Sequence, residues 1–159
     1  MRTRLDGKTI DTASRVIHAS PKRIYRALLD PEALAVWLPP KGMRGTFFSF
    51  DARVGGGYRM ALIYDAPDRT EPGKTSEDAD IVQVHFLALV EDETIAQAVD
   101  FESDDPAFAG TMRMTWTLRA DGEGTLVSIV CANVPVGITA DDHDEGLRSS
   151  LANLAAFIE

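Results

Sequence analysis

Cysteine, histidine and long apolar runs are all scarce in this sequence, and each scarcity excludes a class of protein. The single cysteine, Cys131, has no second cysteine with which to form an internal disulfide. His18, His85 and His143 lack the helical or short-loop spacing of a metal site. No apolar segment approaches the length of a membrane span. We therefore expect no disulfide, no metal ion, no cofactor and no membrane insertion.

Positive charge is also scarce. Lysine and arginine number 16 against 25 acidic residues, which gives a formal net charge of −9. Nucleic-acid phosphates and anionic membrane surfaces attract proteins with a net positive charge, so neither is an expected partner. The first residues, MRTRLDGKTIDT, are polar and unlike a signal peptide, which favours a cytoplasmic location.

The chain has the size and composition of one globular domain. Its 159 residues can bury a sizeable core, and 45% hydrophobic with 26% charged residues is ordinary for a folded protein. We expect residues 1–8 to be a loose leader and residues 9–159 to form a single domain. The sequence leaves a homodimer open.

Two short helices are expected early in the chain, after a first strand at about residues 9–19. Ser20-Pro21 has the pattern of a helix start, and Asp30-Pro31 repeats it. The second helix should stop at Pro39-Pro40.

Strand patterns then follow at short spacing, and a helix closes the chain. The expected strands cover residues 43–53, 57–65, 81–90, 94–103, 111–118 and 125–134, with a long loop at 66–79 that could form an entrance. From Thr139 onward, Leu147, Leu151, Leu154 and Ile158 recur on one helical face, with His143 at its N-terminal end.

These elements predict an α+β fold. Short turns between the later strands require a largely antiparallel sheet. A helix with one apolar face needs a sheet to cover it. We expect a curved antiparallel sheet of about six or seven strands that grips the long C-terminal helix, with two short helices after the first strand.

Several segments carry a resemblance to a known superfamily: ASPKRIYRALLDPEALAVWLPP, FDARVGGGYRM and HDEGLRSSLANLAAFIE. The chain resembles the helix-grip (SRPBCC) superfamily, which includes START and birch-pollen-allergen-like proteins, over about residues 10–159. It is most similar to the bacterial branch related to the activator of the heat-shock-protein-ninety ATPase. The resemblance implies a hydrophobic cavity but transfers no catalytic motif. Many relatives have tryptophan after the glycine of the last helix, where this chain has Gly146-Leu147.

Large apolar side chains are candidates for the cavity wall. Strand alternation places Tyr58, Met60 and Tyr64 on one face of their strand, and Met112, Met114 and Trp116 likewise on one face of theirs. Together they would border a single cavity. A filled core would use the same residue types, so both interpretations remain open.

A few polar groups could orient a ligand. Gln97 and Asn133 alternate with apolar residues and would need partners if they face inward. His143 could act as a base or orient a ligand, or it could simply bond a loop carbonyl. The candidate ligand-binding residues are Trp37, Tyr58, Met60, Tyr64, Gln97, Met112, Met114, Trp116, Asn133, His143 and Leu147.

Three functions fit these observations. The first is binding of a small apolar or amphipathic molecule. The second is an enzyme of the lyase, cyclase or hydrolase kind that uses the same pocket through His143 or Tyr64. The third is a protein-interaction or co-chaperone module. No catalytic residue is assigned.

Overall fold

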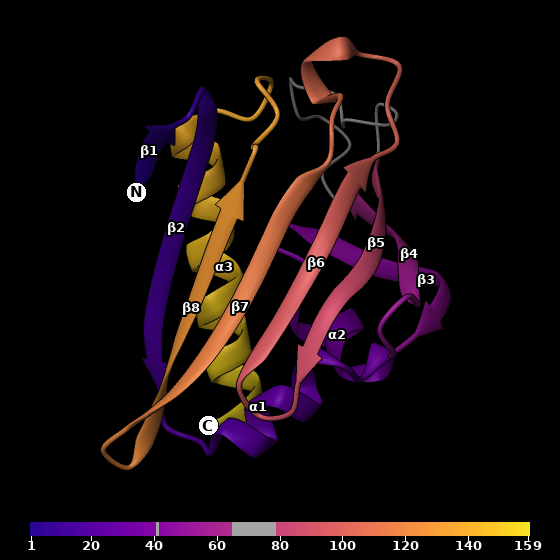
Figure 1. Ribbon diagram of the computed structural model, residues 1–159. Helices are drawn as coiled ribbons and strands as arrows, with labels where there is room; N and C mark the ends of the chain where they lie inside the picture. The colour runs from indigo at the N-terminus through magenta and orange to yellow at the C-terminus, as the bar shows by residue number, and fades with distance from the viewer. Residues whose placement is uncertain (41, 65–78) are drawn as a thin grey trace.

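One antiparallel sheet of eight strands curves around the helices in the computed structural model, which describes residues 1–40, 42–64 and 79–159 (Figure 1). The strands lie in the order β1-β2-β8-β7-β6-β5-β4-β3. Their bounds are β1 Arg2–Leu5, β2 Lys8–Ile17, β3 Met43–Asp51, β4 Gly57–Tyr64, β5 Ala79–Val90, β6 Thr94–Phe101, β7 Met112–Asp121 and β8 Gly124–Ala132. The helices are α1 Pro21–Leu28, α2 Pro31–Trp37 and α3 Ala140–Ile158, with a 3₁₀ turn η1 at Pro106–Phe108.

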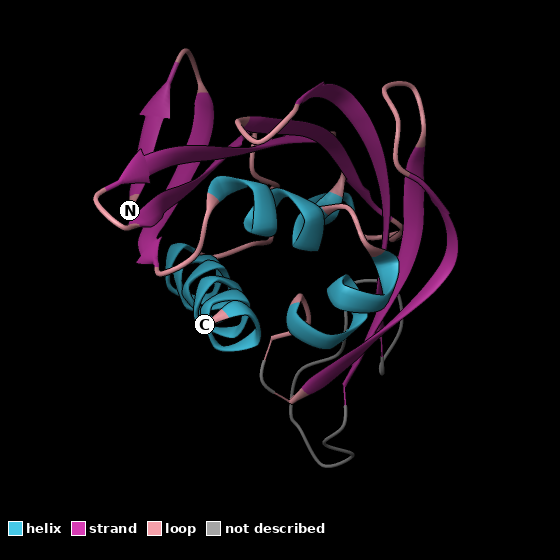
Figure 2. Ribbon diagram, turned by 90° about the horizontal axis from the view of Figure 1, so that it is seen from below, coloured by secondary structure: helices cyan, strands magenta, loops and turns pink. Residues whose placement is uncertain are grey.

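The long helix α3 lies on the concave side of the sheet, and α1 and α2 lie beside it (Figure 2). Its apolar stripe is buried as predicted: Leu147, Leu151, Leu154 and Ile158 are all in the core. The α+β helix-grip fold expected from the sequence is therefore confirmed.

The strand count differs from the expected six or seven because residues 1–8 are not a loose leader. Residues Arg2–Leu5 form β1, which pairs with β2 so that Leu5 faces Lys8 and Arg2 faces Asp11. Asp6 and Gly7 make the turn with φ values of 53° and 75°. An Asp-Gly pair with positive φ at both positions is the favoured two-residue hairpin turn, so the hairpin has a local cause.

The helix starts follow the predicted caps. The Ser20 hydroxyl accepts from the Arg23 amide, and the Asp30 carboxylate accepts from the Glu32 amide at 3.0 Å. The Thr139 hydroxyl accepts from the Asp142 amide at 3.2 Å. Each cap satisfies a backbone donor that the helix itself leaves unpaired.

The glycine-rich corner between β3 and β4 holds the strands at close range. A side chain at Gly57 would collide with the carbonyl oxygen of Val84, so only glycine lets β4 approach β5 there. This corner sets the position of Tyr58, the next residue. The loop expected at 66–79 lies outside the described residues, apart from Ala79 at the start of β5. No helix in the described part of the chain is long and apolar enough to cross a membrane.

Candidate ligand-binding cavity

A cavity of about 180 Å³ lies between the inner face of β4–β7 and helices α2 and α3. Most of the predicted ligand-binding residues line it. They are Trp37, Tyr58, Met60, Gln97, Met112, Met114, Trp116, His143 and Leu147. Aliphatic side chains from all of these elements complete the wall, among them Leu34, Val84 and Val99.

Two tryptophans form one side of the wall. Trp37 of α2 and Trp116 of β7 meet edge to face, with ring centroids 5.8 Å apart and planes at 82°. The Trp37 indole nitrogen donates to the carbonyl oxygen of Ala27 at 3.0 Å. Because the indole N–H is already hydrogen-bonded to the protein, the Trp37 ring presents only apolar surface to the cavity.

Tyr58 of β4 and Gln97 of β6 are two polar side chains of the same wall. The Tyr58 ring stacks on Phe50 with centroids 5.4 Å apart, which fixes its position. Burial raises the pKa of the Tyr58 hydroxyl, and a hydrogen bond from Gln97 lowers it in part. The hydroxyl therefore stays protonated at neutral pH. Gln97 is itself only 5% exposed.

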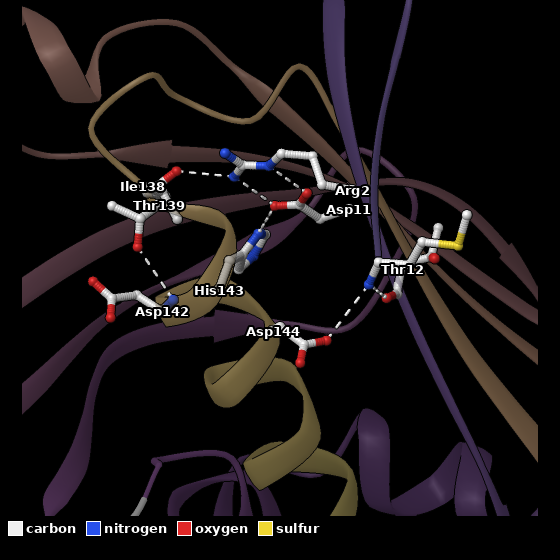
Figure 3. Close-up of polar contacts among 9 residues, drawn as sticks. Arg2, Asp11, Thr12, Ile138, Thr139, Asp142, His143 and Asp144 are labelled. Carbon is white, nitrogen blue, oxygen red and sulfur yellow. Dashed lines mark hydrogen bonds and ion pairs between the residues drawn. The ribbon is translucent and has the colours of Figure 1, made fainter.

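His143 belongs to a buried polar cluster at one end of the cavity (Figure 3). Its Nδ1 lies 2.5 Å from the carboxylate of Asp11 in β2. Arg2 of β1 grips the same carboxylate with bonds of 2.8 and 2.9 Å, and also donates to the Ile138 carbonyl oxygen at 2.9 Å. These hydrogen bonds connect β1 and β2 to the start of α3.

The electrostatics of this cluster favour an ionised carboxylate. Burial acts to raise the pKa of Asp11, but the hydrogen bonds from Arg2 and His143 outweigh it, and the pKa is lowered overall. An ionised Asp11 accepts, so the proton between the two side chains resides on His143 Nδ1. The carboxylate fixes the orientation of the imidazole at the cavity wall.

Sequence reasoning missed Arg2 and Asp11. One signal was available for Asp11. It lies six residues before Ile17 in the same strand, so strand alternation turns both inward. A carboxylate that faces a core needs partners. Arg2 gave no such signal, because its role depends on the β1–β2 hairpin.

Gly146 adds open space to the wall from α3. It lies three residues after His143 and lines the cavity. A methyl group built at this position would have no atom within 4 Å. Glycine inside a helix lowers the free energy of unfolding by about 1 kcal/mol relative to alanine. The absence of a side chain at this position leaves space in the cavity beside α3.

Two predicted residues do not line the cavity. Tyr64 is half-buried, and its hydroxyl donates to the Asp80 carboxylate at 3.1 Å. Asn133 is exposed beyond the end of β8, where its φ of 60° breaks the strand alternation that was expected to turn it inward. Its amide donates to the Thr111 carbonyl oxygen instead.

The lone cysteine lies in the core, and the described acidic residues form no metal-binding group. Cys131 is buried, and burial raises the pKa of its thiol to about 12. Within the described residues, no group of three or more His, Cys, Asp and Glu side chains is placed to hold a metal ion.

An antiparallel sheet curved around a long C-terminal helix defines a helix-grip protein. The chain belongs to the family described as activator of Hsp90 ATPase homolog 1-like protein, whose model matches residues 18–159. This confirms the resemblance seen in the sequence. Membership supports a ligand-binding or co-chaperone-like domain.

Solved structures agree with this assignment. Protein CV1439 from Chromobacterium violaceum is 36% identical, with a TM-score of 0.83 over 94% of this chain and 96% of that one. Mll3558 from Rhizobium loti is 24% identical, with a TM-score of 0.69 over 94% and 96% of the two chains. The second likeness shows the fold alone. The comparison with curated proteins gave no match.

Proposed function

We propose that the protein binds a small apolar or amphipathic molecule in the cavity between α3 and the sheet. The observation that carries the proposal is the cavity itself, with its wall of tryptophan, methionine and aliphatic side chains and a few polar groups. Ligand sites combine these features: apolar area supplies affinity, and a few placed polar groups supply orientation.

The volume limits the size of the ligand. About 180 Å³ is smaller than most drug-sized sites and close to a cavity of about 150 Å³ that holds benzene. This volume is large enough for a molecule with one aromatic ring. Met60, Met112 and Met114 could adjust to a somewhat larger one, because methionine side chains are flexible.

The expected affinity is modest. Burying a ring of about 150–250 Å² gives roughly 4–6 kcal/mol at 25 cal/mol per Å². Part of this is lost as translational and rotational freedom. We expect a Kd of about 0.1–1 mM for a simple hydrocarbon such as toluene.

Tryptophan fluorescence tests the proposal directly. The chain has two tryptophans, and both line the cavity, so titration with toluene should change their emission. Val99→Phe puts extra volume into the cavity wall and should abolish or weaken the change. Val130→Phe is the matched control, since Val130 is 38% exposed on β8 and outside the lining. A saturable response that Val99→Phe leaves untouched would show that toluene binds elsewhere.

One observation favours an enzyme as a second hypothesis. A carboxylate that orients an imidazole is a common arrangement for general bases, and the Asp11–His143 pair lies at the cavity wall. Mass spectrometry of bound compounds before and after incubation would reveal turnover, with His143→Gln as the comparison. The cytoplasmic location and the homodimer both remain predictions.

A further inference from the structure

Some residues of the cavity wall are only half-buried, and they meet at one end of the cavity, which we call the mouth. They are Leu38, Pro40, Leu62, Phe101, Met114, His143 and Gly146. Strands β4 and β6 end there and β7 begins there, because neighbouring strands of an antiparallel sheet run in opposite directions. The first turns of α3 and residues 38–40, which connect α2 to β3, complete the mouth.

The borders of the mouth differ in how firmly the backbone holds them. Strands β4, β6 and β7 each pair with a strand on both sides, so ladders of hydrogen bonds hold them along their length. Pro39 and Pro40 cannot donate to such a ladder, because proline has no backbone N–H. Residues 38–40 lead into β3, which lies at the edge of the described sheet. A segment of this kind opens more readily than the interior of a sheet.

Two side chains of α3 hold residues 38–40 against that helix. The Ser150 hydroxyl donates to the carbonyl oxygen of Leu38 at 3.2 Å, and the Asn153 amide donates to the carbonyl oxygen of Pro39 at 3.0 Å. Both carbonyls follow Trp37, the last residue of α2, where a helix leaves carbonyl groups without partners of its own. The two hydrogen bonds therefore cap α2 and also join it to α3 across the mouth.

Packing adds little to these bonds one turn earlier along α3. Gly146 lines the cavity four residues before Ser150, and a methyl group built there would meet no atom within 4 Å. The hydrogen bonds of Ser150 and Asn153 thus carry much of the attachment between α3 and residues 38–40.

We propose that these two hydrogen bonds form a latch on the mouth of the cavity. A ligand enters and leaves when residues 38–40 separate from α3, and Ser150 and Asn153 hold the segment in place between these events. This inference rests on the proposed function, because it concerns access to the same cavity.

A latch controls the rates of binding and leaves the affinity unchanged. Loss of one hydrogen bond makes the open state more frequent in the free and in the bound protein. Association and dissociation then accelerate by the same factor, and their ratio, the Kd, stays constant. The net contribution of a typical hydrogen bond corresponds to a factor of about 2–12 in the opening equilibrium.

NMR measurements of toluene exchange test the latch. Relaxation dispersion of a ¹³C-labelled Met60 methyl group in the cavity wall gives the dissociation rate, and the Kd from tryptophan fluorescence then gives the association rate. Ser150→Ala and Asn153→Ala should each raise both rates about 2–12-fold at an unchanged Kd. Asn153→Ala is the cleaner variant, because Asn153 is not part of the cavity wall. Asn153→Asp keeps the side-chain shape without the N–H, so it should accelerate exchange as well.

Two control variants remove the same side-chain types away from the mouth. Ser149→Ala changes the neighbour of Ser150 on α3, which lies outside the cavity wall. Asn133→Gly removes the amide that donates to the Thr111 carbonyl oxygen beyond β8, and glycine suits the φ of 60° at this position. Neither variant should change the rates of toluene exchange.

The outcomes separate the latch from the ligand-binding proposal. Wild-type exchange rates in Ser150→Ala and Asn153→Ala would show that toluene passes through another part of the mouth, and would overturn the latch alone. Faster dissociation at an unchanged association rate would also overturn it, because the bonds would then stabilise the bound state. If toluene does not bind the wild-type chain, the ligand-binding proposal is wrong and the latch falls with it.

Discussion

Replacing Gly146 by alanine should stabilise the protein and weaken ligand binding at the same time. Gly146 lies inside α3, and its φ is outside the left-handed region, so alanine suits the backbone. Alanine is about 1 kcal/mol more favourable than glycine in a helix interior. A methyl group would meet no atom within 4 Å, so no clash subtracts from this gain.

The expected net effect is a gain of about 0.5–1 kcal/mol in the free energy of unfolding, or roughly 1–4 °C in Tm. Urea unfolding followed by circular dichroism measures the change in the free energy of unfolding. Toluene titration measures the change in ligand affinity, which should fall because the methyl group adds volume at the cavity wall.

Gly137→Ala provides a matched control. A methyl group there would lie 2.8 Å from the Phe108 ring and 3.0 Å from Ala107, so this variant should lose stability. If Gly146→Ala also lost stability, atoms would have to occupy the space beside Gly146. The claim that the cavity extends to Gly146 would then be wrong.

Three further predictions follow from other parts of the molecule. Leu151→Ala should cost about 2–5 kcal/mol in urea unfolding, because Leu151 is buried in the α3 stripe; a loss under about 1 kcal/mol would show that the stripe is not core. Asp11→Asn should cost about 1–3 kcal/mol of unfolding free energy at pH 7. Folding lowers the pKa of Asp11, so the stability that its carboxylate contributes is fully present above about pH 4. That contribution is lost as the pH falls through the pKa of Asp11 in the folded state. The wild type and Asp11→Asn should therefore converge in acid, and a constant difference from pH 7 to pH 3 would contradict the ionised pair. Cys131, whose thiol pKa is raised to about 12 by burial, should react with a thiol reagent only upon unfolding; rapid reaction in native buffer would show that it is accessible.

The helix starts and the buried face of α3 could be predicted from the sequence because they depend on local patterns. The caps at Ser20, Asp30 and Thr139 satisfy backbone donors within a few residues, and the α3 stripe repeats at helical spacing. The Asp6-Gly7 hairpin was equally local, but Leu5 is the one apolar residue of β1 and is exposed, so hydrophobic alternation gave no signal for that strand.

The candidate site was predictable only where strand alternation held. It placed Gln97 and Met114 correctly on the cavity face, and it misplaced Asn133 because β8 ends at Ala132. The Arg2–Asp11–His143 cluster joins residues more than 130 positions apart. Such contacts depend on how strands and helix meet in space, which no local pattern encodes.

Methionine methyl NMR tests the central claim most directly, because the five methionines divide between the cavity and the rest of the protein. Met60, Met112 and Met114 line the cavity, whereas Met1 and Met43 do not. With ¹³C-labelled methyl groups, titration with phenol or toluene should shift the three cavity signals along saturable curves and leave the other two in place. Cavity signals that stay unchanged at millimolar ligand, or shifts of similar size at all five positions, would contradict a binding site between α3 and the sheet.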